Sequence, residues 1–376
     1  MMKTDLCKLL NIDIPVFAFS HCRDVVVEVS KAGGFGVLGI AGFSLEQLEA
    51  ELQWIDERIG DKHYGVDLLI PQTRVEECDL DKLQGMIPQK QRDFVDSLLE
   101  QTNTPELPAD HQGHFASADQ MGIIGDRPYE MLAQSLKHKK ITLYVNALGI
   151  PPERVMKMCC EAGVKTAAMA GKVKHAVQHK EAGVDMVISV GSEAAGHTGD
   201  ISTMVLTPQV VDAVAPLPVL AAGGIASGRQ VAAALALGAE GVWTGSVWLP
   251  TSESELSQIQ REKIVRCASE DTLRSRCLTG KPVRMMRSAF TDAWDAPGAP
   301  EALAFPLQPL LTQEAMNRFE KFDVEEMVTY PAGQVIGALK QEQSVRQVVL
   351  GMMEEYLACT ERLSETRACY LSRLRP

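Results

Sequence analysis

The sequence has no run of about 18 consecutive apolar residues, so we expect no membrane-spanning helix. It also has no CxxC pair, although it contains nine cysteines. An odd number of cysteines without that spacing argues against a disulfide framework or a structural zinc site, and we expect reduced thiols and no metal. The N-terminal stretch MMKTDLCKLLNIDIP carries an acidic residue and lacks a long apolar core, unlike a signal peptide. These absences predict a cytoplasmic protein.

Basic residues are fewer than acidic ones. The chain has 37 Lys and Arg against 49 Asp and Glu, a formal net charge of −12. This balance argues against nucleic acid or an anionic membrane surface as a partner, and it leaves a small molecule as the expected one. With 45% hydrophobic and 23% charged residues in a chain of 376, the composition is that of a soluble globular protein.

Eight short, nearly continuous apolar runs alternate with helix-like segments that often end in Ala-Gly or Gly. This alternation is typical of parallel strands joined by crossover helices, and eight such strands favour a closed (β/α)8 TIM barrel, an α/β fold, over residues 1–250. An open doubly wound sheet is the alternative, but no GxGxxG stands directly after the first run, where a dinucleotide-binding fold would place one. The expected strands cover residues 14–19, 35–40, 64–70, 141–147, 164–170, 184–190, 217–222 and 240–245.

Two segments interrupt this pattern. Residues 71–140 form a polar, partly helical insertion after the third strand, which we expect to cover the strand C-termini as a lid. Residues 251–376 are expected to be a mainly helical C-terminal extension. Within it, QSVRQVVLGMMEEYLACTERL predicts a strongly amphipathic helix that packs on the barrel or, as an alternative, supports a homodimer.

Glycine-rich corners follow the last two expected strands. In VLAAGGIASGRQ the strand runs into Gly223 and Gly224 before a helix capped by Ser227, and the eighth strand ends at Gly245 and Ser246. Glycines let backbone N–H groups approach an anion, and the barrel often binds phosphate after strands seven and eight. Ordinary tight turns are the alternative, but the occurrence of both corners favours a phosphate-bearing ligand.

A histidine lies among small residues in GSEAAGHTGD, directly after the sixth expected strand. His197 is therefore expected at the barrel mouth, where an imidazole can take a proton from a carbon acid or donate to an oxyanion. The alternative is that the ring only shapes the turn. For Glu193 we expect a structural role, in which the carboxylate accepts backbone N–H groups of its own loop.

The segment FSHCRD after the first expected strand places three further candidates near the mouth. His21 and Arg23 are candidate substrate-binding residues, although Arg23 can equally open the following helix. Cys22 is an unfavoured nucleophile, because nothing in the sequence indicates a lowered thiol pKa.

Several stretches resemble a known family. KAGGFGVLG (31–39), YGVDLLI (64–70), GSEAAGHTG (191–199) and AAGGIASGRQVAAALALGAEGVWTGS (221–246) are similar to those of the FMN-dependent nitronate monooxygenase, or 2-nitropropane dioxygenase, family. The related flavin-dependent enoyl-thioester reductases share these motifs. The resemblance covers the expected barrel without its insertion.

The resemblance implies FMN at the strand C-termini, with Ala18 and Phe19 approaching the isoalloxazine through their backbone. Asp67 stands where the family usually has Asn, Val190 where Gln or Glu is common, and Ala195 where Gly is usual. These departures are compatible with the cofactor and leave the substrate open. The implied cofactor-binding residues are Ala18, Phe19, Asp67, Gly191, Gly196, Ala222, Gly223, Gly224, Gly245 and Ser246. The last four of these would hold the phosphate.

Three functions follow from these observations. The first is an FMN-dependent monooxygenase that oxidises alkyl nitronates with O2 to a carbonyl compound and nitrite, with His197 acting on the substrate. The second is an enoyl-thioester reductase that uses NAD(P)H as co-substrate. The third, from another class, is a non-redox barrel that binds a phosphate-bearing ligand.

Overall fold

The computed structural model describes residues 4–70, 80–108 and 126–374. Eight parallel strands close into a barrel in the order β1-β2-β3-β4-β5-β6-β8-β9. The strands are β1 (Val16–Ser20), β2 (Phe35–Gly39), β3 (Tyr64–Leu68), β4 (Ile141–Asn146), β5 (Lys165–Ala170), β6 (Met186–Val190), β8 (Val219–Ala222) and β9 (Gly241–Thr244). Each strand coincides with one of the eight apolar runs, β1 extending one residue beyond its run, so the predicted TIM barrel is confirmed.

The N-terminal end of the barrel is plugged. Helix α1 (Asp5–Leu10) contributes Leu6 and Leu10 to the same buried cluster as Phe17 and Phe35, whose side chains come from β1 and β2. The Thr4 hydroxyl ties this helix to the Glu240 carbonyl at the start of β9, with a hydrogen bond of 2.8 Å. The C-terminal ends of the strands are therefore the end at which a ligand can enter.

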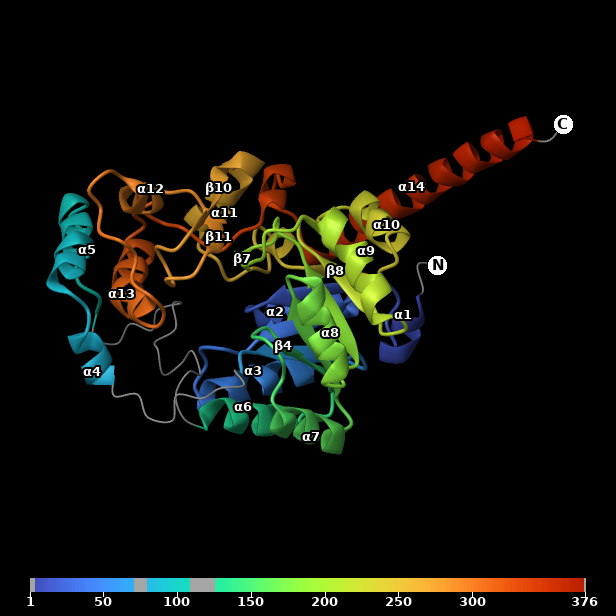
Figure 1. Ribbon diagram of the computed structural model, residues 1–376, viewed down its shortest axis with the longest axis horizontal. Helices are drawn as coiled ribbons and strands as arrows, with labels where there is room; N and C mark the ends of the chain where they lie inside the picture. Colours follow the sequence, from blue (N-terminus) through green and yellow to red (C-terminus); the bar gives the residue numbers. More distant parts are fainter. Residues whose placement is uncertain (1–3, 71–79, 109–125, 375–376) are drawn as a thin grey trace.

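Seven helices connect the strands around the barrel (Figure 1). Ser44 and Ser227 begin two of these helices with a capping box, each paired with a glutamine three residues later. No helix in the described part of the chain is both long and apolar enough to span a bilayer. The connecting helices are α2 (Arg23–Lys31), α3 (Leu45–Arg58), α6 (Arg127–Ser135), α7 (Glu153–Ala162), α8 (Val173–Glu181), α9 (Thr203–Val214) and α10 (Gly228–Ala236).

The eighth helical position is taken by α14 (Val345–Leu374), about one hundred residues after β9. It packs against α10 and α2, as its amphipathic pattern predicted. Val349 and Met352 are buried there, and a Cβ on Gly228 would collide with the backbone of α14, so only glycine permits this crossing. The C-terminal half of α14 extends away from the barrel (Figure 1), and its described side chains from residue 361 on are exposed.

A second core lies beside the barrel mouth. Phe290 and Trp294 of α12 (Ala289–Asp295) pack with Phe319 of α13 (Leu307–Lys321), and Leu98 of α5 (Gln89–Gln101) joins them. Figure 1 shows α4 (Leu80–Gly85) and α5 of the insertion on this side of the molecule, next to α13. The insertion helices α4 and α5 thus pack with the C-terminal region, while α6 packs on α3.

The C-terminal region also contains strands that the sequence did not indicate. Strands β10 (Thr272–Ser275) and β11 (Val283–Met286) pair antiparallel, and β11 pairs in turn with β7 (Gly196–His197). Two strands of four residues and one of two are too short for a period-two pattern to be visible, and they depend on tertiary pairing. The remaining helix of this region is α11 (Gln258–Arg266).

Candidate active site

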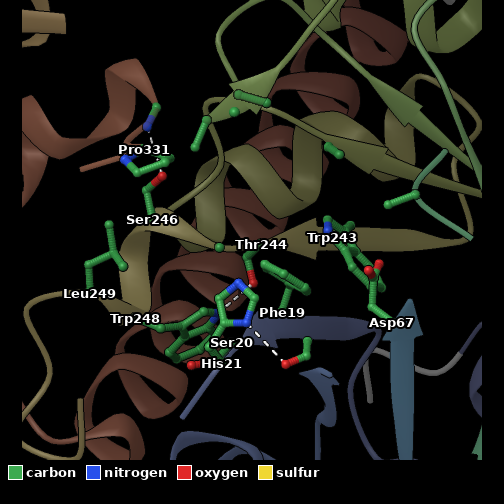
Figure 2. Close-up of a pocket in the computed structure, with 18 of the residues that line it drawn as sticks. Phe19, Ser20, His21, Asp67, Trp243, Thr244, Ser246, Trp248, Leu249 and Pro331 are labelled. Atoms are coloured by element: carbon green, nitrogen blue, oxygen red, sulfur yellow. Dashed lines mark hydrogen bonds between the residues drawn. The ribbon is translucent and has the colours of Figure 1, made fainter. Parts of the chain in front are cut away.

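A cavity of ≈ 390 Å³ opens at the C-terminal ends of the barrel strands. Its floor includes Phe19, Asp67, Met169 and Trp243, and its walls come from the loop 194–197, the segment after β9 and residues 330–335. Figure 2 shows Asp67 and Trp243 toward one side of this cavity and Ser246 and Leu249 toward the other. No described residue of the insertion lines it, and the rest of the insertion, 71–79 and 109–125, lies outside the described residues, so the lid stays a prediction.

The two glycine corners meet in this cavity. Gly223 and Gly224 follow β8 with φ of +109° and +70°, a backbone that favours glycine. Gly223 is also packed closely, since a Cβ there would lie 2.7 Å from Oγ1 of Thr203. Gly245 and Ser246 follow the neighbouring strand β9, and a Cβ on Gly245 would meet no atom within 4 Å. The corners therefore border a shared open space.

Backbone donors are available at these corners. Within the described part of the chain, no hydrogen bond engages the backbone N–H of Gly224, Gly245 or Ser246. The Ser246 side chain accepts the Gly333 N–H at 2.8 Å, which leaves its own hydroxyl proton for a ligand. Unpaired N–H groups around an open space are the usual protein environment of a phosphate, so the corners fit the flavin phosphate that the sequence resemblance implies.

Glu193 organises the loop between β6 and α9. Its Oε2 accepts hydrogen bonds from the Thr203 backbone N–H at 2.9 Å and from the Thr203 hydroxyl at 3.0 Å. The carboxylate thus caps the first residue of α9, where the helix dipole favours a negative charge. A structural role for Glu193, accepting backbone N–H groups, is confirmed, although the donor lies ten residues away.

Residues 330–335 line the cavity beside the glycine corner that follows β9. Besides the bond from Gly333 to Ser246, the Gln334 N–H donates to the Glu193 carbonyl at 3.0 Å. A Cβ on Gly333 would lie 2.7 Å from that same carbonyl. Sequence reasoning missed this segment; the only signal was the turn-forming Pro-Ala-Gly at 331–333.

His197 lines the cavity from β7. Its Nε2 lies 3.0 Å from Oγ1 of Thr279, and that hydroxyl lies 3.2 Å from the Lys281 carbonyl. If Thr279 donates its one proton to that carbonyl, Nε2 of His197 carries the proton shared with Thr279, and Nδ1 keeps a lone pair. Desolvation by the surrounding protein lowers the pKa of His197, and the Lys281 ammonium adds to this, so the neutral imidazole predominates at neutral pH.

His21 also lines the cavity, on the side of β2. Its Nδ1 lies 3.0 Å from the Gly39 carbonyl, and because a carbonyl only accepts, Nδ1 carries a proton. Phe19 contacts the His21 ring edge-on and stacks on Trp243, with ring centroids 5.9 Å apart in the second pair. Together they form an aromatic wall near the strand ends, which can contact a flat ligand.

Arg23 and Cys22 are held by other groups. The Arg23 guanidinium lies 4.5 Å from the centroid of the Trp54 ring and 2.8 Å from the Glu51 carboxylate, and it does not line the cavity. It opens α2, the alternative that the sequence left open. The Cys22 thiol donates to the Glu253 carbonyl, and burial raises its pKa, so it is not an activated nucleophile.

The other sequence-predicted positions divide into two groups. Phe19, Asp67, Gly196 and Ala222 line the cavity, together with the four corner residues. Ala18 is buried within β1 and does not line it, and a Cβ on Gly191 would collide with Thr203. The requirement for glycine at 191 is therefore explained by packing against α9.

Asp67 is the most unusual of the lining residues. The side chain is only 5% exposed, and its Oδ2 has no hydrogen-bond partner among the described residues. Burial alone raises the pKa of Asp67 to about 8. A carboxyl group in this state is a protonated acid at neutral pH and can donate a hydrogen bond into the cavity.

Comparison with known proteins places these features in a family. The family model described as nitronate monooxygenase matches residues 3–355. The chain is 47% identical to a Mycobacterium tuberculosis protein named "Putative monooxygenase Rv1533", over 95% of this chain and 97% of that protein. It is 29% identical to a Staphylococcus aureus protein named "Probable nitronate monooxygenase", over 77% of this chain and 80% of that protein.

Solved structures share the fold. A nitroalkane oxidase from Streptomyces ansochromogenes superposes with a TM-score of 0.78 at 24% identity, covering 95% of this chain and 99% of that one. FabK from Thermotoga maritima gives a TM-score of 0.72 at 23% identity, covering 97% of this chain and 100% of that one. At these identities the likeness supports the architecture alone.

Proposed function

We propose that this chain, which belongs to the nitronate monooxygenase family and is an oxidoreductase of that type, binds FMN and oxidises alkyl nitronates. The products are a carbonyl compound and nitrite, with O2 as co-substrate. Family membership sets aside the non-redox barrel. The identity of the flavin and the reaction are our inference from the site.

The observation that best supports FMN is that the two glycine corners border the same open space. The backbone N–H groups of Gly224, Gly245 and Ser246 and the Ser246 hydroxyl border one open space. Their number and type suit a phosphate dianion, and the helix that begins after Ser227 adds a favourable dipole. The aromatic wall of Phe19 and Trp243 supports a flat ring system farther along the cavity.

When bound, the flavin supplies the electron acceptor and the site for reaction with O2. The protein contributes proton chemistry and orientation. We assign His197 as the group that takes the carbon-bound proton when a neutral nitroalkane binds, or donates to the nitro oxygens when a nitronate binds. Its lowered pKa keeps the ring neutral and able to accept a proton at physiological pH.

The substrate space is mostly apolar. Apolar lining residues include Leu249, Leu256, Ile225 and Val335, and no Lys or Arg is among the described residues that line the cavity. Hydrogen bonding to the two imidazoles, rather than an ion pair, would then orient the substrate's polar end. This arrangement supports a small substrate with an apolar tail.

The test begins with the purified protein. We expect flavin absorption bands, and release of FMN on denaturation. Anaerobic mixing with an alkyl nitronate should bleach these bands, whereas NADPH and NADH should not. Rapid bleaching by a nicotinamide and none by the nitronate would contradict the monooxygenase and support the enoyl-thioester reductase.

A further inference from the structure

The carboxyl group of Asp67 is buried at the floor of the cavity and has no compensating partner among the described residues. It comes from β3, between Gly39 of β2 and Val145 of β4, and it lines the cavity shown in Figure 2. No described side chain or backbone group donates a hydrogen bond to it. Burying an unpaired carboxylate is costly, so a group kept here without a partner points to a ligand.

Its polar neighbours are already engaged. Tyr144 of β4 donates its hydroxyl to Oδ1 of Asn146 at 3.0 Å, and the Asn146 amide donates to the carbonyls of Leu148 and Gly149. Thus neither supplies Asp67 with a donor. Five other titratable side chains of the described part of the chain line the cavity, and none forms an ion pair or hydrogen bond with Asp67: His21, His197, Cys22, Glu255 and Tyr330.

We propose that Asp67 is a hydrogen-bond partner of the flavin ring that takes up a proton when the flavin is reduced. The inference rests on the proposed flavin site. Two electrons and one proton give a reduced ring with one negative charge. A second proton passes from solvent to the Asp67 carboxylate wherever that group is ionised beforehand.

Electrostatics favours protonation of Asp67 when the flavin is reduced. A reduced, anionic ring beside an ionised carboxylate forms a buried like-charge pair, which favours protonation of the carboxyl group. Burial raises the pKa of Asp67 to about 8 without a ligand, so proton uptake on reduction becomes observable above that pH. The asparagine usual at this position in the family does not titrate in this pH range.

The experiment is spectroelectrochemical titration of the flavin-loaded protein at several values between pH 8 and 10. For the wild type we expect two protons per two electrons, so the midpoint potential falls with pH twice as steeply as for Asp67→Asn. Glu255→Gln, which removes an exposed carboxylate from the cavity rim, serves as the matched control and should keep the wild-type slope.

Equal slopes in the wild type and Asp67→Asn would overturn the proposal. Asp67→Ser provides the same comparison if the asparagine variant does not fold. A second measurement does not require reduction of the flavin. The absorption spectrum of the oxidised, flavin-loaded wild type should change with pH in a one-proton step that is missing from Asp67→Asn. A wild type purified without flavin would contradict the proposed function itself, whereas bound flavin with equal slopes contradicts only the role of Asp67.

Discussion

The backbone N–H of Gly333 donates a hydrogen bond of 2.8 Å to Oγ of Ser246. This bond joins the glycine corner after β9 to a segment that arrives 87 residues later in the chain. It makes the C-terminal region part of the candidate site, because the serine hydroxyl is oriented by a residue outside the barrel.

Substituting Gly333 by alanine should therefore weaken flavin binding. The new Cβ would lie 2.7 Å from the Glu193 carbonyl, and relieving that contact moves the N–H away from Ser246. We expect a loss of about tenfold in flavin affinity, corresponding to one hydrogen bond. Flavin fluorescence titration measures it. Gly351→Ala, where a Cβ meets nothing within 4 Å, is the control, and an unchanged affinity in Gly333→Ala would contradict this role.

A carboxylate introduced at Gly245 should abolish retention of a phosphate-bearing flavin. The Cβ of Gly245→Asp enters open space, so the fold is kept while a negative charge is placed in the corner. Gly245→Ala tests the effect of bulk without charge and should lose less affinity. Flavin content after gel filtration, together with a far-UV circular dichroism spectrum, decides the outcome. Full flavin occupancy in the aspartate variant would argue against a phosphate at this corner.

His197→Ala should retain bound flavin and lose about 100-fold or more in kcat/KM for a neutral nitroalkane. Since the pKa of His197 is lowered from its ordinary value of 6.5, we expect wild-type kcat/KM to rise with pH and to reach half of its maximum below that value. Thr279→Val removes the partner of Nε2 and should alter this profile while leaving flavin content unchanged. Identical steady-state pH profiles for wild type and His197→Ala would remove the imidazole from the chemistry.

Asp67→Asn should stabilise the flavin-free protein at neutral pH. The folded-state pKa of about 8 lies above the unfolded-state value near 3.8. Between these values the unfolded chain releases a proton that the folded chain keeps, so the wild type loses up to about 1.4 kcal/mol of unfolding free energy per pH unit as pH rises. The variant lacks this loss. The free energy of unfolding, measured with urea from pH 4 to pH 8, should differ less between wild type and variant at pH 4 than at pH 8. A difference that does not change with pH would contradict a buried acid.

The barrel was predictable because each of its strands is covered on both faces and therefore appears as an apolar run. The glycine corners were predictable because backbone with φ of +109° or +70° favours glycine. At Gly191 the constraint that the structure shows is a different one, packing against Thr203, and its role in binding a cofactor stays a prediction. Glycine alone does not separate these two causes.

The remaining parts of the site depend on tertiary approach. Tyr330 and Gly333 reach the cavity only because the C-terminal region folds back over the barrel mouth, and the Pro-Ala-Gly at 331–333 indicates a turn but not its place at the site. The burial of Asp67 was implied by its place in an apolar run. That no described residue hydrogen-bonds its carboxyl group was not implied, because this depends on where Tyr144 and Asn146 direct their own hydrogen bonds.

The central claim is that the corners after β8 and β9 hold the phosphate of FMN. Comparison of FMN with riboflavin, which lacks only that phosphate, tests it most directly by isothermal titration calorimetry. Two or more charge-assisted hydrogen bonds from backbone N–H groups predict that FMN binds about 100-fold more tightly or better. Equal affinities for the two flavins would contradict it.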